Sequence, residues 1–271
     1  MLSLGFELPA VALRTAGSSS SPAPFSPLQL APSAMFDPAN TAQLYQDDAG
    51  TTAVTADNQP VGLWQDETLN GLDLSQAVSA ARPSYRTDGT YHWIETDGVD
   101  DGLVSLPSLR VGNPMTMVLG YQLLTTVGAA RVNFAEISKN SANGMSMGSH
   151  ASYDRLQYYS RLVQEGVNAS NLVANSIWGG HQIRVATLQT YAGGATMRLD
   201  GVKVMTRSQN LMSEFVDAQP LRVGLAEVSG SIPGAFRLYG LQVWDSTRPQ
   251  PSLTQIEMLE QWMADKIGVT L

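Results

Sequence analysis

The chain has 271 residues, a formal net charge of −8 and a hydrophobic content of 43%, which allows one large all-β domain or two small ones. An acidic chain without a run of Lys or Arg is not expected to bind nucleic acid, because neutralising phosphates requires a basic patch. The absence of cysteine excludes disulfides, thiolate catalysis and cysteine-ligated metals.

The first 32 residues differ in composition from the rest. Residues 1–13 are apolar, and residues 14–33 are rich in Ser and Pro. No stretch reaches the roughly 20 apolar residues of a membrane span, so we expect no membrane insertion. Residues 1–32 are predicted to be an extended docking arm followed by a linker, and the alternative for residues 1–13 is an edge strand of the main domain. The arm residues expected to insert into a neighbouring subunit are Leu2, Leu4, Phe6, Leu8 and Val11.

The remainder, residues 33–271, reads as one domain of short strands separated by turns. Residues 116–124 alternate clearly, and they place Met117, Leu119 and Tyr121 on one face. Asp200-Gly201 separates two short apolar runs and predicts a two-residue hairpin turn. The predicted strands are Leu44–Gln46, Val61–Gln65, Tyr91–Glu95, Leu103–Leu106, Thr116–Leu124, Arg131–Ile137, Leu156–Val163, Leu172–Trp178, Gln182–Thr190, Ala195–Leu199, Val202–Thr206, Leu221–Gly224 and Phe236–Trp244.

One helix is predicted, and it is the last element. Ser252 and Gln255 have the spacing of a capping box, and Gly268 stands where a C-terminal stop belongs. Between them, apolar residues recur mostly at spacings of three and four. These residues are Leu253, Ile256, Leu259, Trp262, Met263 and Ile267. Many strands followed by a single helix predict an antiparallel jelly-roll β-sandwich.

Three segments resemble the concanavalin A-like, LamG-type jelly rolls. They are residues 94–105 (IETDGVDDGLVS), residues 197–204 (MRLDGVKV), and residues 221–224 (LRVG) with 236–244 (FRLYGLQVW) and the helix start at Ser252. This resemblance implies a concanavalin A-like sandwich closed by its C-terminal strand and helix.

A narrower resemblance adds the N-terminal half. Residues 34–38 (AMFDP), 44–47 (LYQD), 50–55 (GTTAVT), 60–64 (PVGLW) and 81–83 (ARP) follow an order that is similar to bacteriophage proteins. Those proteins are tail, fibre, baseplate or decoration components with a LamG-like domain. The resemblance implies a virion structural protein that is located on the virion and contacts other virion proteins and copies of itself. Residues 64–71 (WQDETLNG) depart from the family's W-x-D-x-S-G-N-G loop.

Two acidic patterns are candidates for catalysis or for metal binding. Glu95, Asp97 and Asp100 superficially resemble the Glu-x-Asp-x-x-Glu motif of jelly-roll glucanases, in which two carboxyls act as nucleophile and acid. The third acid is Asp and Gly98 interrupts the strand, so catalysis is not expected there. Asp97, Asp100 and Asp101 also offer clustered oxygens of the kind that Ca²⁺ prefers. We interpret them as turn-forming acids, and we expect no cofactor, with Ca²⁺ as the ion if any is bound.

Residues 144–148 (GMSMG) match the pattern of a nucleophile elbow around Ser146. An elbow requires a strand before the serine and a helix after it, whereas the flanks here are Ser- and Asn-rich. We predict a hairpin loop without a catalytic role.

Aromatic residues gather in the middle of the chain, and aromatic faces commonly stack on sugar rings. The residues predicted to contact glycan are Tyr153, Tyr158, Tyr159, Trp178 and His181, with core packing as the alternative. Trp64, Trp93, Trp244 and Trp262 are predicted to lie in the core.

Three functions follow from these patterns. The first is a non-enzymatic virion protein, anchored by its arm and carrying a lectin-like domain that assembles and offers a surface for host-cell glycan. The second is a carbohydrate-binding adsorption module. The third is a jelly-roll glycan hydrolase dependent on Glu95.

Overall fold

The computed structural model describes residues 24–106, 108–124, 132–140, 143–149, 155–161, 170–177, 181–207, 218–225 and 234–271. The arm residues Leu2, Leu4, Phe6, Leu8 and Val11 lie outside these ranges, so their insertion stays a prediction. Among the helices within them, none is long and apolar enough to cross a membrane.

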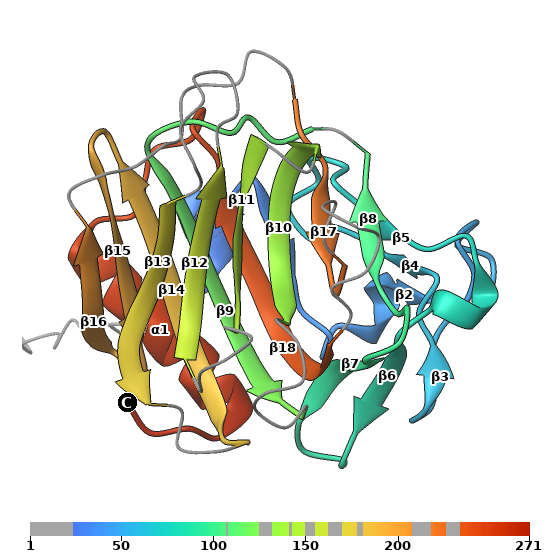
Figure 1. Ribbon diagram of the computed structural model, residues 1–271. Coiled ribbons are helices and arrows are strands. Elements are labelled where there is room, and N and C mark those ends of the chain that lie inside the picture. The colour runs from blue at the N-terminus through green and yellow to red at the C-terminus, as the bar shows by residue number, and fades with distance from the viewer. Residues whose placement is uncertain are drawn as a thin grey trace, which may run out of the picture.

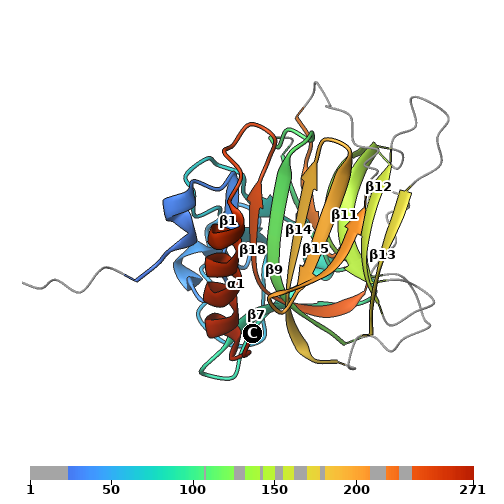
Figure 2. The same ribbon diagram turned by 90° about the vertical axis from the view of Figure 1, so that its left-hand side faces the viewer.

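Two antiparallel sheets lie face to face, and one helix covers the outer side of the first sheet (Figures 1 and 2). Sheet A has the order β16-β15-β14-β9-β18-β7-β6-β3, with β1 beside β18, and sheet B has the order β13-β12-β11-β10-β17-β8-β5-β4-β2. The predicted antiparallel jelly-roll β-sandwich with one C-terminal helix is confirmed.

The bounds of the strands are β1 (Ala34–Phe36), β2 (Leu44–Tyr45), β3 (Gln59–Pro60), β4 (Leu63–Trp64), β5 (Leu74–Ser75), β6 (Ser84–Thr87), β7 (His92–Asp97), β8 (Leu103–Ser105), β9 (Met115–Leu123), β10 (Asn133–Asn140), β11 (Asn143–Ser149), β12 (Arg155–Arg161), β13 (Ser170–Ile177), β14 (Ile183–Tyr191), β15 (Gly194–Leu199), β16 (Val202–Arg207), β17 (Leu221–Val223) and β18 (Ala235–Trp244). Helix α1 spans Leu253–Ile267. Short 3-10 turns occupy Pro27–Leu30, Thr41–Gln43 and Ser79–Ala81.

The main core fills the space between the sheets. Met117, Leu119 and Tyr121 of β9 point into it, as their alternation predicts, and Ile137 of sheet B meets them there. Burying one such large side chain stabilises the fold by roughly 1.5–3 kcal/mol. The hairpin at Asp200-Gly201 is also confirmed, since both residues have positive φ, at 48° and 76°.

A second apolar cluster lies between sheet A and α1. Leu259, Met263 and Ile267 pack against Val118 and Val185 of the sheet. Gly120 and Gly240 allow this close approach, because a Cβ at either position would meet Met263 at 2.8 Å and 3.0 Å respectively.

The predicted helix is confirmed at both ends. Ser252 and Gln255 form the complete capping box, and Gly268 ends the helix in the left-handed conformation with φ 69°. Its predicted apolar face is partly wrong, because Leu253 is 58% exposed. Trp262 is half-buried at the outer side of the helix and does not lie in the core.

Residues 24–32, assigned to the linker, contact the body. Phe25 and Leu30 pack against the cluster beneath α1, and Trp244 Nε1 donates to the Leu30 carbonyl at 2.9 Å. This end of the Ser/Pro-rich region therefore buries more than its composition predicts. The division at residue 32 stays a prediction.

Candidate functional site

The outward side of sheet B carries polar side chains that are buried. On β10 and β11, Ala135, Ile137, Met145 and Met147 point into the core. Glu136 and Ser146 alternate with these residues and therefore face away from the core.

Strand register aligns a row of residues across this outward side. Glu136 lies opposite Arg222 on β17 and opposite Ser146 on β11. Ser146 in turn lies opposite position 159 on β12, which lies opposite position 171 on β13. Cross-strand partners share a face of the sheet, so the row spans five strands from β17 to β13.

We call Glu136, Ser138, Ser146, Gln157 and Arg222 the polar face. Four of these residues are almost completely buried, with exposures of 4% for Glu136, 3% for Ser138, 5% for Ser146 and 3% for Gln157. Burying a polar group is unfavourable unless it finds a partner. Burying the polar face on the outward side of the sheet therefore lowers the stability of the fold unless these groups are hydrogen-bonded.

Hydrogen bonds join three members of the polar face. Arg222 Nη1 donates to the Ser138 carbonyl and to Ser138 Oγ, each at 3.0 Å. Ser138 Oγ donates to Glu136 Oε1 at 2.6 Å. The serine hydroxyl thus accepts a hydrogen bond from the guanidinium and donates one to the carboxylate. These bonds offset part of the unfavourable free energy of burying the Glu136 charge.

Gln157 is different, because its Oε1 has no hydrogen-bond partner within the described part of the chain. Leaving such an acceptor unpaired costs about 1–3 kcal/mol. A hydroxyl group brought by a ligand would supply the missing donor. Together the polar face offers carboxylate, carboxamide, hydroxyl and guanidinium groups, which are suited to a ligand rich in hydroxyls.

The predicted aromatic glycan site is only partly brought together. Tyr158 is fully buried in the main core, so the prediction that its ring contacts glycan is wrong. Position 159 lies in the outward row, opposite Ser146. Tyr153 and Trp178 lie outside the described residues.

His181 is exposed and lies two residues before β14 of sheet A. Its Nδ1 is 2.9 Å from the Leu123 carbonyl, and its own carbonyl accepts from Gln122 Nε2 at 2.6 Å. These bonds tie the ends of β14 and β9, so His181 is not on the polar face.

Ser146 was predicted to lie in a loop, and this prediction is wrong. Residues 143–149 form β11, in the middle of sheet B, and Ser146 lies on the polar face. The element that follows in the described chain is strand β12, so the strand-turn-helix geometry of a nucleophile elbow is not found there.

The three acids at the end of β7 and in the turn that follows it do come together. The ligand atoms of Asp97, Asp100 and Asp101 lie within 4.8 Å of one another. Asp97 Oδ1 accepts from the Val99 amide at 2.7 Å, and Asp101 Oδ2 accepts from the Asp97 amide at 2.9 Å. Burial, with a smaller contribution from the two neighbouring carboxylates, raises the pKa of Asp101 to about 6. The bonds are those expected of a turn, and Ca²⁺ binding stays a prediction.

Glu95, the residue of the hydrolase hypothesis, is held by three donors. Its Oε1 accepts from Arg86 Nη1 at 3.2 Å. Its Oε2 accepts from Trp93 Nε1 at 3.0 Å and from Arg237 Nε at 2.7 Å. Both oxygens are therefore engaged in a network on sheet A, which favours a structural role.

The fold defines the class of protein: an all-β jelly-roll domain, of which solved binding domains are examples. The binding domain of botulinum neurotoxin serotype G matches with a TM-score of 0.56 and 8% identity, over 74% of this chain and 48% of that one. The binding domain of Paraclostridial Mosquitocidal Protein 1 matches with a TM-score of 0.55 and 12% identity, over 73% of this chain and 49% of that one. The receptor binding domain of botulinum neurotoxin mosaic serotype C/D matches with a TM-score of 0.54 and 9% identity, over 73% of this chain and 48% of that one.

This chain spans about half the length of these solved structures. At such identities the likeness shows a shared fold. No family model and no curated protein matches the sequence.

Proposed function

We propose that this chain is a non-catalytic carbohydrate-binding module and that the polar face is its binding surface. The observation that carries the proposal is the polar face itself, where the Glu136–Ser138–Arg222 network shares the outward side of sheet B with Gln157, whose buried Oε1 has no partner among the described residues. Jelly-roll structures of binding and receptor-binding domains support the same class of function.

The chemistry of the polar face suits a neutral or weakly charged glycan. Glu136 and Arg222 are cross-strand neighbours, so the charges of the carboxylate and the guanidinium offset each other. Serine and glutamine side chains can then bind the hydroxyl groups of a glycan through directional hydrogen bonds.

A glycan array probed with the full chain and with a Gln157→Leu variant tests the proposal. Removing an unpaired buried acceptor leaves stability unchanged or higher, so a structural role predicts no loss of binding. We expect at least about a tenfold loss of affinity, because the leucine cannot pair with a glycan hydroxyl. Gln261→Leu, on the outer side of α1, is the matched control. Absence of glycan binding by the parent, or equal binding by both variants, would refute the proposal.

A Glu95→Gln variant distinguishes the hydrolase alternative from a non-catalytic binding module. For a non-catalytic module, neither the parent nor this variant should release sugar from any polysaccharide that the parent binds. Turnover by the parent that disappears in the variant would assign catalysis to Glu95.

A second proposal concerns where the module works. We propose that it is carried on a bacteriophage particle, attached through Leu2, Leu4, Phe6, Leu8 and Val11 to other virion proteins or to copies of itself. The order of motifs between residues 34 and 83 favours this role. Particles assembled with a Leu4→Asp/Phe6→Asp variant should lose the protein, while particles with Gln157→Leu should keep it. Equal retention of both variants would argue against arm-mediated attachment.

A further inference from the structure

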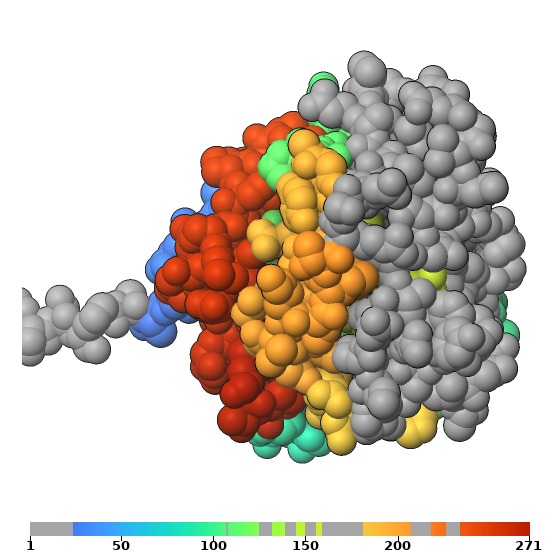
Figure 3. All heavy atoms as spheres, turned by 60° about the vertical axis from the view of Figure 1, so that its left-hand side comes forward, coloured from blue at the N-terminus to red at the C-terminus, as the bar shows by residue number. Residues whose placement is uncertain are grey.

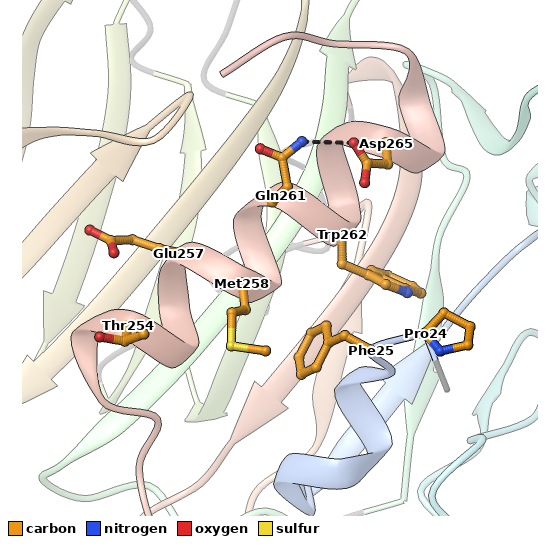
Figure 4. Close-up of a pocket in the computed structure, with 8 residues that line it drawn as sticks. All are labelled: Pro24, Phe25, Thr254, Glu257, Met258, Gln261, Trp262 and Asp265. Atoms are coloured by element: carbon orange, nitrogen blue, oxygen red, sulfur yellow. Dashed lines mark hydrogen bonds between the residues drawn. The ribbon is translucent and has the colours of Figure 1, made fainter. Parts of the chain in front are cut away.

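An apolar groove runs along the outer side of α1, on the side of the helix that faces away from sheet A (Figure 4). Its volume is about 700 Å³, and its apolar walls are Pro24, Phe25, Met258 and Trp262. Glu257 and Asp265 stand at its rim. Figure 3 shows the helix and the strands beside it at the molecular surface.

The walls of the groove are fixed in place. Phe25 packs against the cluster beneath the helix, and the Lys266 ammonium lies 4.8 Å from the centre of the Trp262 ring. Lys266 is itself held by an ion pair with Asp37. Met258, by contrast, is 41% exposed. A preformed apolar groove with an exposed methionine is a feature typical of a docking surface.

The chain itself carries a segment that fits. Leu2, Leu4, Phe6 and Leu8 alternate with other residues, so an extended segment would present all four on one side. At roughly 3.3 Å per residue, the distance from Leu2 to Phe6 is about 13 Å and that from Leu2 to Leu8 is about 20 Å. The groove extends from Thr254 to Asp265, which is about 16 Å at 1.5 Å per helical residue. The groove is therefore long enough for the segment from Leu2 to Phe6, and Leu8 would lie about 4 Å beyond its end.

The attachment point also fits. Pro24 is a wall of the groove, so residues 9–23 form the tether that joins the apolar segment to it. Fifteen residues reach up to about 50 Å, which is well beyond the length of the groove. A short tether gives an effective concentration on the order of millimolar, and this favours a segment of the same chain over that of a second copy.

We propose that the groove binds residues 2–8 of the same chain. In the isolated protein this docking covers the apolar side chains of both partners. A neighbouring subunit on an assembly would then compete with the groove for the same residues. The inference does not depend on glycan binding, and its test uses the isolated chain, so it can fail independently of virion attachment.

The absence of cysteine from the sequence allows a clean cross-linking test in the full chain. Leu4→Cys is combined with Met258→Cys in the groove, and disulfide formation under mild oxidation is followed on non-reducing gels. The control combines Leu4→Cys with Val78→Cys, which is 60% exposed and lies between β5 and β6, away from α1 (Figure 1). We expect the groove pair to form an intramolecular disulfide at least about tenfold faster than the control pair, as the effective concentration implies.

Two further measurements keep the result decisive. Adding Leu2→Asp and Phe6→Asp to the groove pair should lower its rate to that of the control, and the thermal midpoint should show that the body remains folded. A groove pair that reacts no faster than the control would overturn the proposal. A covalent dimer in place of the monomer would also overturn it and would assign the groove to a second copy.

Discussion

Replacing Glu260 with glutamine should loosen helix α1 from sheet A. Glu260 is 1% exposed, and its carboxylate forms the main polar link between the helix and β15. Arg198 Nε lies 2.8 Å from Oε1 and 3.1 Å from Oε2, and Arg198 Nη2 lies 2.9 Å from Oε2. Such a two-pronged pair combines charge with fixed geometry.

The expected loss of stability in Glu260→Gln follows from the burial of both Arg198 and Glu260. Arg198 is 8% exposed, so a variant without the carboxylate leaves a guanidinium with little access to water. Breaking a buried pair from one side costs about 3–5 kcal/mol. For a chain of this size, that is a fall in the thermal midpoint of roughly 6–20 °C.

Removing both charges should be much less harmful. Arg198→Met with Glu260→Leu fills the same space with apolar atoms, and such replacements are often neutral or stabilising. The carbonyl of Gly201 loses its 2.6 Å bond from Arg198 Nη2, but Gly201 is partly exposed and water can replace the donor. We expect the double variant within about 1–2 kcal/mol of the parent.

Urea denaturation followed by far-ultraviolet circular dichroism measures the free energies of unfolding of the parent, Arg198→Met, Glu260→Leu and the double variant, which together form a double-mutant cycle. A coupling energy above about 2 kcal/mol is expected for a buried pair. If Glu260→Gln lowers the free energy of unfolding by less than about 1 kcal/mol, as for an exposed pair, the pair does not anchor the helix and the reasoning is wrong.

Three other predictions concern isolated groups. Burial and the nearby Asp37 charge raise the pKa of Glu67 to about 7. The contribution of Glu67 to stability is therefore present below pH 4.5 and is lost as pH rises through 7. Denaturation at two pH values should show that Glu67→Gln raises the free energy of unfolding at pH 8 by about 1–2 kcal/mol and changes it little at pH 5. Gln242 is fully buried and both of its side-chain polar atoms lack a partner within the described residues, so Gln242→Leu should raise the thermal midpoint, by an amount equivalent to about 1–3 kcal/mol; a lower midpoint would mean that the carboxamide is paired. If Ca²⁺ binds the turn after β7, titration calorimetry should detect it in the parent and not in Asp100→Asn, while heat in both or in neither would leave this turn without an ion.

Local signals predicted the fold well. The capping box at Ser252, the positive φ at Asp200-Gly201 and the alternation through Met117 depend only on near neighbours in sequence, so the sequence predicts them correctly. Strands such as β3 and β5 are two residues long, which is too short to show alternation. β11 was missed because its glycines, serines and methionines resemble a loop, and its pairing with β10 and β12 outweighs that weak local preference.

The candidate site was largely beyond sequence reasoning. Arg222 and Ser138 are 84 residues apart in the chain, and only the register of β17 on β10 brings them together. One signal was present: Glu136 lies between the apolar residues Ala135 and Ile137 in the predicted strand Arg131–Ile137, and Ser138 follows that strand directly, which indicates a polar outward side. The aromatic residues drew attention to β12, but the alternation along this strand places Tyr158 in the core.

The arrangement of the two sheets separates the proposed binding surface from the proposed attachment. The polar face lies on the outward side of sheet B, whereas α1 and its groove lie beyond sheet A, on the opposite side of the sandwich (Figure 2). A ligand on the polar face therefore does not obstruct the groove or the chain that leaves it at Pro24. If both proposals hold, the module would stay attached through its N-terminal residues without occupying the outward side of sheet B.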